Sequence, residues 1–276
     1  CEVFNSDGTE HKSNSRAKLR KTLDAGAKNA NPWVGFEQEY VMLSENRILG
    51  WPKEGEPGEQ GPYYCGAGAE KVAGRDLVEY HAELCLEAGL LFYGINAEVM
   101  LGQWEFQIGY RGVAGEDAGA LNAADHLWLS RYLLSRAGEK FDISVTFENK
   151  PMKGCWNGSG MHTNFSTDAT RNKSNGRAAI DAAIKALAAT HAKHIKVYGH
   201  ALDERLTGEY ETSDIHSFSA GAADRGSSIR IPKPVEINGH GYFEDRRPGA
   251  NADPYEVANA LCESVCLGEN FQQNAA

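Results

Sequence analysis

Short segments of alternating apolar and polar residues occur along most of the chain, and segments with helical periodicity separate them. The period of two predicts strands at 1–4, 35–43, 91–100, 103–109, 143–147 and 160–165. The period of 3.6 predicts helices at 15–24, 75–88 and 177–198, and another around 127–133. A last helix begins at Asp253-Pro254, where an N-cap, a first-turn proline and the capping-box acid Glu256 combine. The sequence shows no repeat and no linker, so we expect one α+β domain over residues 1–276.

Two glutamates lie two positions apart in the predicted strand at 35–43. Because side chains alternate along a strand, Glu37 and Glu39 point to one face, and Phe36, Gln38 and Tyr40 point to the other. The simpler interpretation is that this face is the solvated side of a half-buried strand. These two glutamates alone therefore do not indicate a functional site, and further acids near them would be needed to indicate one.

A second pair of acids flanks a predicted hairpin. If Leu101-Gly102 is a two-residue loop, Glu98 lies directly opposite Glu105. Like charges that face each other across strands destabilise a sheet, by roughly 4 kcal/mol at ~4 Å in an effective dielectric of about 20. A fold keeps such a pair only with a cation, a raised pKa or an opposing base. The sequence therefore predicts an oxygen-rich cation site.

One histidine is a candidate ligand for this site. His162 lies in Gly-Ser-Gly-Met-His-Thr-Asn, where glycines let the backbone approach a crowded site. Carboxylates with one imidazole suit Mg²⁺ or Mn²⁺ better than zinc. A single histidine is more often structural, so spacing alone leaves this role open. His191 and His194, in the alanine-rich segment, have no acid near them in sequence and are interpreted as surface or core residues.

Candidate anion-binding groups are concentrated in the last third of the chain. The sequence has neither a P-loop nor a dinucleotide-binding glycine motif. It offers arginines instead, whose guanidinium forks suit phosphate and carboxylate, although surface solvation is the default for each one. They are Arg205, Arg225, Arg230, Arg246 and Arg247. These patterns predict a two-metal phosphoryl-transfer site of unknown substrate.

Composition excludes several classes of protein. There are 28 lysines and arginines against 38 aspartates and glutamates, and the resulting formal charge of −10 argues against nucleic acid as a partner. No apolar run approaches the ~20 residues of a membrane span, and the N-terminus lacks a secretory pattern. The six cysteines are scattered, which favours reduced thiols and a cytoplasmic protein.

Several segments have distinctive sequences when they are read in chain order. They are Gly35-Phe-Glu-Gln-Glu-Tyr40, Gly61-Pro-Tyr-Tyr-Cys-Gly66, Trp156-Asn-Gly-Ser-Gly-Met-His-Thr-Asn164, Arg225-Gly-Ser-Ser-Ile-Arg230 and Tyr242-Phe-Glu-Asp-Arg-Arg-Pro248. These segments resemble the eukaryotic-like (type II) glutamine synthetase family, and the match is highly specific and runs collinearly across nearly the whole chain. The resemblance implies the catalytic-domain fold of that family, a curved, mostly antiparallel sheet flanked by helices and similar to that of guanido kinases.

The resemblance also implies roles for individual residues. One metal site would consist of Glu39, Glu98 and Glu105, and a second of Glu37, His162 and Glu244. The remaining roles concern glutamate, the transferred phosphoryl group and a closing flap. Asn157 and Gly158 would hold the backbone groups of the amino acid, Arg205 and Arg246 would bind glutamate carboxylates, Arg225 and Arg230 would stabilise the phosphoryl group, and Glu211 would be the flap acid that deprotonates ammonium.

The implied reaction is the ATP-dependent ligation of ammonia to glutamate through a γ-glutamyl phosphate, with two or more Mg²⁺ or Mn²⁺ ions. The family forms homo-oligomers of stacked rings, which implies a decamer for the full-length form. Two alternatives stay open: a related ligase that joins glutamate to another amine, and a non-catalytic remnant. The second arises because the family's N-terminal β-grasp domain, which supplies an ammonium-binding aspartate, has no counterpart in this sequence. We therefore expect the chain alone to make little glutamine.

Two local departures from the family pattern bear on ATP binding. Asp224 stands where asparagine is typical, beside arginines expected near ATP. The Gly/Ala/acid-rich stretch at 110–124 is longer than the usual connection.

Overall fold

The computed structural model describes residues 1–268. Its strands are β1 (Trp33–Ser44), β2 (Arg47–Ile48), β3 (Phe92–Ala97), β4 (Gln103–Ile108), β5 (Ser144–Thr146), β6 (Met161–Ser166), β7 (Ala220–Ala222), β8 (Ile229–Ile231) and β9 (Phe243–Asp245). They form one sheet in the order β3-β4-β1-β6-β9-β8-β7, and β2 and β5 also pair with β1. Only the β7–β8 pair is parallel among these described strands. The predicted α+β fold with a mostly antiparallel sheet is confirmed.

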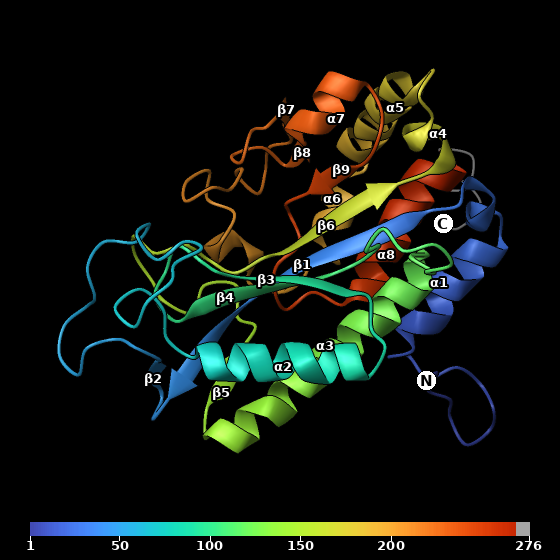
Figure 1. The fold of residues 1–276 in the computed structure, drawn as a ribbon. Helices are drawn as coiled ribbons and strands as arrows, with labels where there is room; N and C mark the ends of the chain where they lie inside the picture. Colours follow the sequence, from blue (N-terminus) through green and yellow to red (C-terminus); the bar gives the residue numbers. More distant parts are fainter. Residues whose placement is uncertain (269–276) are drawn as a thin grey trace.

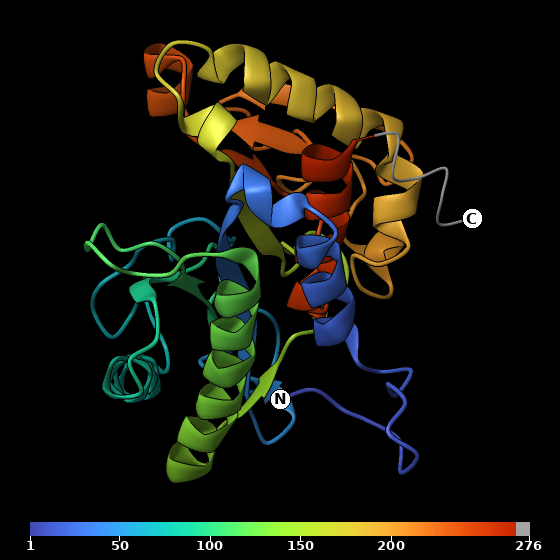
Figure 2. The ribbon, with the colours of Figure 1, turned by 90° about the vertical axis from the view of Figure 1, so that its right-hand side faces the viewer.

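Helices cover the sheet from several sides (Figure 1). They are α1 (Ser15–Asp24), α2 (Arg75–Glu87), α3 (Ala120–Phe141), α4 (Asp168–Arg171), α5 (Gly176–Ala189), α6 (His191–Ile195), α7 (Lys233–Asn238) and α8 (Pro254–Leu261). Two short 3-10 helices, η1 (Ala27–Ala30) and η2 (Leu202–Glu204), and a π-helix, η3 (Cys262–Leu267), complete the set. Helices α2 and α3 pack on each other, and α3 and α1 both contact α8. Figure 2 shows α5 across the end of the sheet that holds β8 and β9. None of the helices within residues 1–268 combines the length and apolarity that a membrane crossing requires.

The face of β1 opposite the two glutamates lies in the core. Phe36 and Tyr40 are fully buried, as alternation predicts. Gln38 between them is also fully buried, and its Oε1 accepts a hydrogen bond of 2.9 Å from Arg131 Nε of α3. Arg131 also donates to the carbonyl oxygen of Ala250 at 2.9 Å, so its guanidinium ties α3, β1 and the segment before α8 together. Burial lowers the pKa of Arg131 to about 10.

Two predicted elements differ in the structure. The helix predicted at 177–198 is broken, because Thr190 takes φ −105° between α5 and α6 and its hydroxyl donates to the Ala186 carbonyl oxygen at 2.8 Å. The strand predicted at 1–4 is reduced to one bridge between Phe4 and Glu10, since no longer strand pairs with it within the described residues.

The β3–β4 hairpin has a longer loop than predicted. Asn96 pairs with Glu105, and the Glu98 amide donates to the Gln103 carbonyl oxygen at 2.9 Å, so the loop spans four residues. The prediction that Glu98 directly faces Glu105 is therefore wrong. A left-handed residue, Gly102 at φ +87°, closes the turn, and a Cβ there would lie 2.6 Å from the Leu49 carbonyl oxygen.

The residues of the broken helix join a buried ionic network. Arg247 and Asp245 are both fully buried and form a two-pronged ion pair, with nitrogen–oxygen distances of 2.8 and 2.6 Å. Asp245 also accepts a hydrogen bond from Tyr198 at 2.8 Å, and Tyr198 OH lies 2.6 Å from His194 Nδ1. Arg247 is thus a core residue and not one of the anion-binding arginines. His194 is also a core residue, which is one of the two positions that the sequence left open for it.

Arg247→Met is expected to lower the free energy of unfolding by about 3–5 kcal/mol, because Asp245 would stay buried without its cation. Urea unfolding followed by circular dichroism measures this. Arg136→Met, at an exposed ion pair on α3, is the matched control and should cost less than about 1 kcal/mol. An Arg247→Met variant as stable as the control would contradict this account of the network.

Candidate metal and substrate site

Strand pairing brings the predicted metal ligands onto one face of the sheet. Glu39 of β1 lies directly opposite Glu105 of β4, and Glu37 lies directly opposite His162 of β6. Glu244 comes from β9, which is the next strand beyond β6. The like-charged pair that faces across two strands is therefore Glu39 and Glu105.

Distances between the ligand atoms define two overlapping groups. His162 Nδ1 lies 3.5 Å from Glu37 Oε2 and 3.6 Å from Glu244 Oε1. The ligand atoms of these three residues lie within 4.8 Å of one another, and the same holds for Glu39, Glu105 and His162. Four carboxylates around one imidazole form the donor set of a hard divalent cation, so the residues fit Mg²⁺ or Mn²⁺.

Glu98 lies beside these groups, at the end of β3. Its Oε1 accepts a hydrogen bond of 2.9 Å from Asn96 Nδ2, and its Oε2 accepts one of 3.3 Å from the Val99 amide. Its side chain is buried, and its charge is one of those that raise the pKa of Glu105. Glu98 therefore belongs to the same charged surface, although it is outside the two tightest groups.

Burial and mutual repulsion shift the titration of this surface. Burial, as the largest cause, raises the pKa of Glu39 to about 7 and that of Glu98 to about 8. Burial and three neighbouring carboxylates hold the pKa of Glu105 well above its usual range. Burial and nearby arginines hold the pKa of His162 well below its usual value, so its imidazole is neutral. The surface therefore takes up protons or cations, and it offers a neutral nitrogen ligand.

Three predicted arginines surround the acids. Glu244 accepts hydrogen bonds from Arg230 at 2.7 Å and from Arg246 at 2.5 Å. Arg205 is buried, and its Nη2 lies 3.1 Å from His162 Nε2. The acids are therefore bordered by positive groups of the kind that bind carboxylate or phosphate.

The fourth, Arg225, lies at the rim. Its guanidinium lies 5.4 Å from the Tyr64 ring centre and 3.8 Å from Glu211 Oε2, and nearly half of its side chain is exposed. The preceding Asp224 accepts a hydrogen bond of 2.9 Å from the Gly226 amide, which shapes the turn that presents Arg225.

A clamp that the sequence did not reveal holds the loop of Asn157 and Gly158. Gln60 Nε2 donates to Asn157 Oδ1 at 2.7 Å, and the Asn157 amide donates to Gln60 Oε1 at 2.8 Å. Gly158 has no room for a side chain, since a Cβ would lie 2.4 Å from the Asn149 carbonyl oxygen. Gln60 lies in the segment 50–61, whose turn-forming composition gave no sign of this contact.

The predicted flap acid, Glu211, lies on a turn that contacts Arg225 and Arg246. Tyr210 and Glu211 have φ of 53° and 62°, in the left-handed region that few non-glycine residues adopt. The Glu211 carbonyl oxygen accepts a hydrogen bond of 3.4 Å from Arg246 Nη2. A bridge between Thr207 and Asp214 closes the base of this turn.

An aromatic cavity of about 380 Å³ adjoins the cluster. Trp33, Tyr93, Tyr110 and Tyr242 line it, and the Trp33 and Tyr110 rings lie 4.7 Å apart. Asn164 also lines it and donates to Glu37 Oε1 at 2.8 Å, so the cavity opens beside the acids. The sequence signal was weak, because these aromatics lie far apart along the chain.

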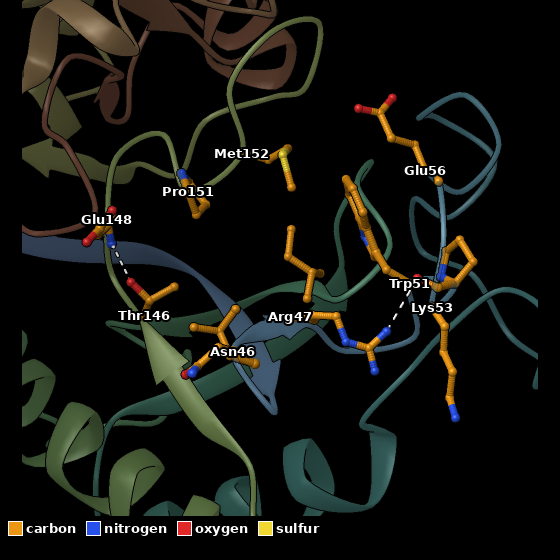
Figure 3. Close-up of a pocket in the computed structure, with 13 residues that line it drawn as sticks. Asn46, Arg47, Trp51, Lys53, Glu56, Thr146, Glu148, Pro151 and Met152 are labelled. Atoms are coloured by element: carbon orange, nitrogen blue, oxygen red, sulfur yellow. Dashed lines mark hydrogen bonds between the residues drawn. The ribbon is translucent and has the colours of Figure 1, made fainter.

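A second pocket, of about 430 Å³, is remote from this chemistry (Figure 3). Arg47, Trp51 and Lys53 form one side, and Thr146 and Met152 form the other. None of the predicted site residues lines it. The candidate site is therefore not this pocket. It is the sheet face that carries Glu37, Glu39, Glu105, His162 and Glu244, here called the carboxylate face.

Comparison with known proteins agrees with this geometry. Residues 12–273 match the family model described as glutamine synthetase, catalytic domain. A chloroplastic glutamine synthetase of Chlamydomonas reinhardtii is 52% identical, over 97% of this chain and 69% of its own length. A glutamine synthetase of Neurospora crassa is 50% identical, over 97% of this chain and 71% of its own. A solved structure described as apo GmaS without ligand superposes with a TM-score of 0.76 at 21% identity, over 98% of this chain but only 61% of that chain, and this likeness shows the fold.

Proposed function

Because this chain belongs to the glutamine synthetase family and spans its catalytic domain, we propose that it joins ammonia to the side-chain carboxylate of glutamate at the carboxylate face of β1, β4, β6 and β9. The observation that carries this assignment is the strand register. It places acids from separate strands around one imidazole and beside three arginines. Curated relatives that are about half identical to this chain are glutamine synthetases. The enzyme class of this chain is accordingly glutamate–ammonia ligase.

Six side chains would hold two divalent cations, with Mg²⁺ or Mn²⁺ as the fitting ions. One set is Glu37, His162 and Glu244, whose ligand atoms lie together. The other is Glu39, Glu98 and Glu105, of which Glu39 and Glu105 face each other and Glu98 adds its charge to theirs. When bound, such cations neutralise charge on the phosphates and on the transferring phosphoryl group. The high pKa values of the acids support this proposal, because a cation can replace the protons that the acids hold, and the imidazole of His162 is already neutral and has no added proton to lose.

The reaction needs two displacements. An oxygen of the glutamate side chain attacks the terminal phosphorus of ATP, the bond to ADP breaks, and γ-glutamyl phosphate forms. Ammonia then attacks the acyl carbon and phosphate leaves, which makes the amide. Arg230 and Arg246, beside Glu244, and Arg225, at the rim, would stabilise the negative charge of the phosphoryl group.

Other residues would bind glutamate and exclude water. Asn157 and Gly158 would hold its backbone groups, in a loop that Gln60 fixes, and Arg205 and Arg246 would bind its carboxylates. Glu211 would take the proton that ammonium loses. The turn that carries Glu211 would cover the site and keep water from the acyl phosphate.

The aromatic cavity would take the base of ATP. Trp33, Tyr110 and Tyr242 offer flat faces for stacking, and Asn164 connects the cavity with Glu37, where the phosphates would lie. This placement adds to the nucleotide-binding roles predicted for Arg225 and Arg230.

The homo-oligomer of stacked rings, a decamer in the full-length form, and the cytoplasmic location stay predictions. An exposed apolar surface on α3 supports an assembly, because Trp128 and Tyr132 are 43% and 60% exposed one helical turn apart. Sedimentation of an active form as a monomer would count against the oligomer.

Metal binding and amine choice test the proposed function. With Mn²⁺, ATP and glutamate, the chain should form γ-glutamyl hydroxamate from hydroxylamine, and ammonia should be preferred over ethylamine by at least about tenfold. Manganese titration should show at least two bound ions per chain. A preference for ethylamine would favour the amine-ligase alternative, and no bound ion with no product would favour the non-catalytic one.

A further inference from the structure

Lys150, which has no role in the site described above, lies in the loop after β5 with only 8% of its surface exposed. Its ammonium group donates a hydrogen bond to the Trp156 carbonyl oxygen. The same ammonium lies 4.7 Å from the centre of the Tyr210 ring, which is cation–π distance. One buried cation thus contacts two segments that are far apart in the sequence.

Each of the two contacted residues immediately precedes a residue of the proposed reaction. Trp156 precedes Asn157 of the glutamate-binding loop, and Tyr210 precedes Glu211 of the flap. Burial lowers the pKa of Lys150, so the carbonyl and the ring replace the water that the ammonium has lost.

The tip of the flap needs such a contact. Tyr210 and Glu211 hold left-handed backbone angles, which persist only when surrounding contacts impose them. Two other cations contact this tip within the described residues. They are Arg225 and Arg246, and both contact Glu211. A cavity of about 540 Å³ opens beside the tip, between Lys150 and Glu209, and leaves space into which an unheld tip can move.

We propose that Lys150 is a positioning residue that ties the glutamate-binding loop to the flap, so that Asn157 and Glu211 are held in place together. The inference rests on the proposed function for the meaning of those two residues, but the contact itself is independent of it. If Lys150 no longer contacts Tyr210, the tip of the flap moves and water reaches the γ-glutamyl phosphate. Hydrolysis of this intermediate to glutamate and phosphate then consumes ATP without forming product.

Five single variants separate this role from simple loop stability. Lys150→Met removes the charge and keeps the chain length, Lys150→Arg keeps a cation that stacks on a ring, and Tyr210→Phe keeps the ring that Tyr210→Leu removes. Lys153→Met is the matched control, because Lys153 lies in the same loop and pairs with Glu204 instead of the flap.

The first readout is the ratio of ATP hydrolysed to hydroxamate formed, with kcat and KM. Lys150→Met and Tyr210→Leu should each raise this ratio and lower kcat about 3- to 30-fold, the range of a desolvated cation–π contact, with the KM for ATP within about twofold. Lys150→Arg and Tyr210→Phe should stay near the unmodified chain, as should Lys153→Met. The Lys150→Met/Tyr210→Leu double variant should be no worse than either single one.

The second readout needs no catalysis. Amide hydrogen exchange at 207–214 should quicken in Lys150→Met and Tyr210→Leu and stay unchanged in Lys153→Met. Unchanged exchange and an unchanged ratio in Lys150→Met would overturn the proposal, as would a Tyr210→Phe variant as impaired as Tyr210→Leu. If the unmodified chain forms no hydroxamate, the proposed function fails, and hydrogen exchange still decides whether Lys150 holds the flap.

Discussion

Glu105→Gln is expected to reduce metal-dependent hydroxamate formation by about 10²- to 10³-fold, the range for loss of one preorganised polar group at a reaction centre. The reason is the position of Glu105, which faces Glu39 directly and contributes to the group around His162. The same change should raise the melting temperature of the metal-free protein, because it removes one of several repelling carboxylates.

Opposite effects on activity and stability distinguish a site residue from a packing residue. Glu83→Gln, the same substitution at an exposed position of α2, is the control and should change neither quantity. Hydroxamate assays and thermal unfolding in a chelator measure both. A Glu105→Gln variant that keeps full activity would contradict the metal-site assignment, and one that melts at lower temperature would contradict the repulsion.

Affinity for Mn²⁺ is expected to rise about tenfold or more per pH unit between pH 6.5 and 8. Each proton that a cation displaces contributes one factor of ten per pH unit in this range, and the pKa values of Glu39, about 7, and Glu98, about 8, lie within it. Calorimetric titration at several pH values measures the slope. Glu98→Gln should lower the slope by about one proton, and a pH-independent affinity would contradict the proposed proton exchange.

The stability of the chelated protein should fall over the same range. Because the pKa values of these carboxyl groups are raised on folding, the folded state holds protons that the unfolded state has already lost, and stability declines as pH rises through about 7 to 8. Below about pH 6.5 the buried histidines His81, His162 and His194, whose pKa values are lowered, act in the opposite direction. The decline should therefore be clearest above pH 6.5.

Strand alternation was sufficient to predict one face of the site. The period of two placed Glu37 and Glu39 together, and the structure confirms that Phe36 and Tyr40 lie in the core on the opposite face. The solvated-strand interpretation fails for Glu39, which is only 8% exposed.

Contacts between distant segments were not predictable in this way. The direct pairing of Glu39 with Glu105 depends on β1 lying between β4 and β6, and no local pattern fixes that order. The charge argument for Glu98 rested on a two-residue loop at 101–102, whereas the strand register leaves a four-residue loop at 99–102. Gln60 and Lys150 come from loops, where no periodicity marks a buried polar side chain.

A crystal structure with Mn²⁺ and a non-hydrolysable ATP analogue tests the central claim most directly, because manganese is located by its anomalous scattering. The account predicts one ion bound by Glu37, His162 and Glu244. It predicts a second ion bound by the facing pair Glu39 and Glu105 together with Glu98, whose charge acts on Glu105. Ions located elsewhere, or these carboxylates turned away from the ions, would contradict it.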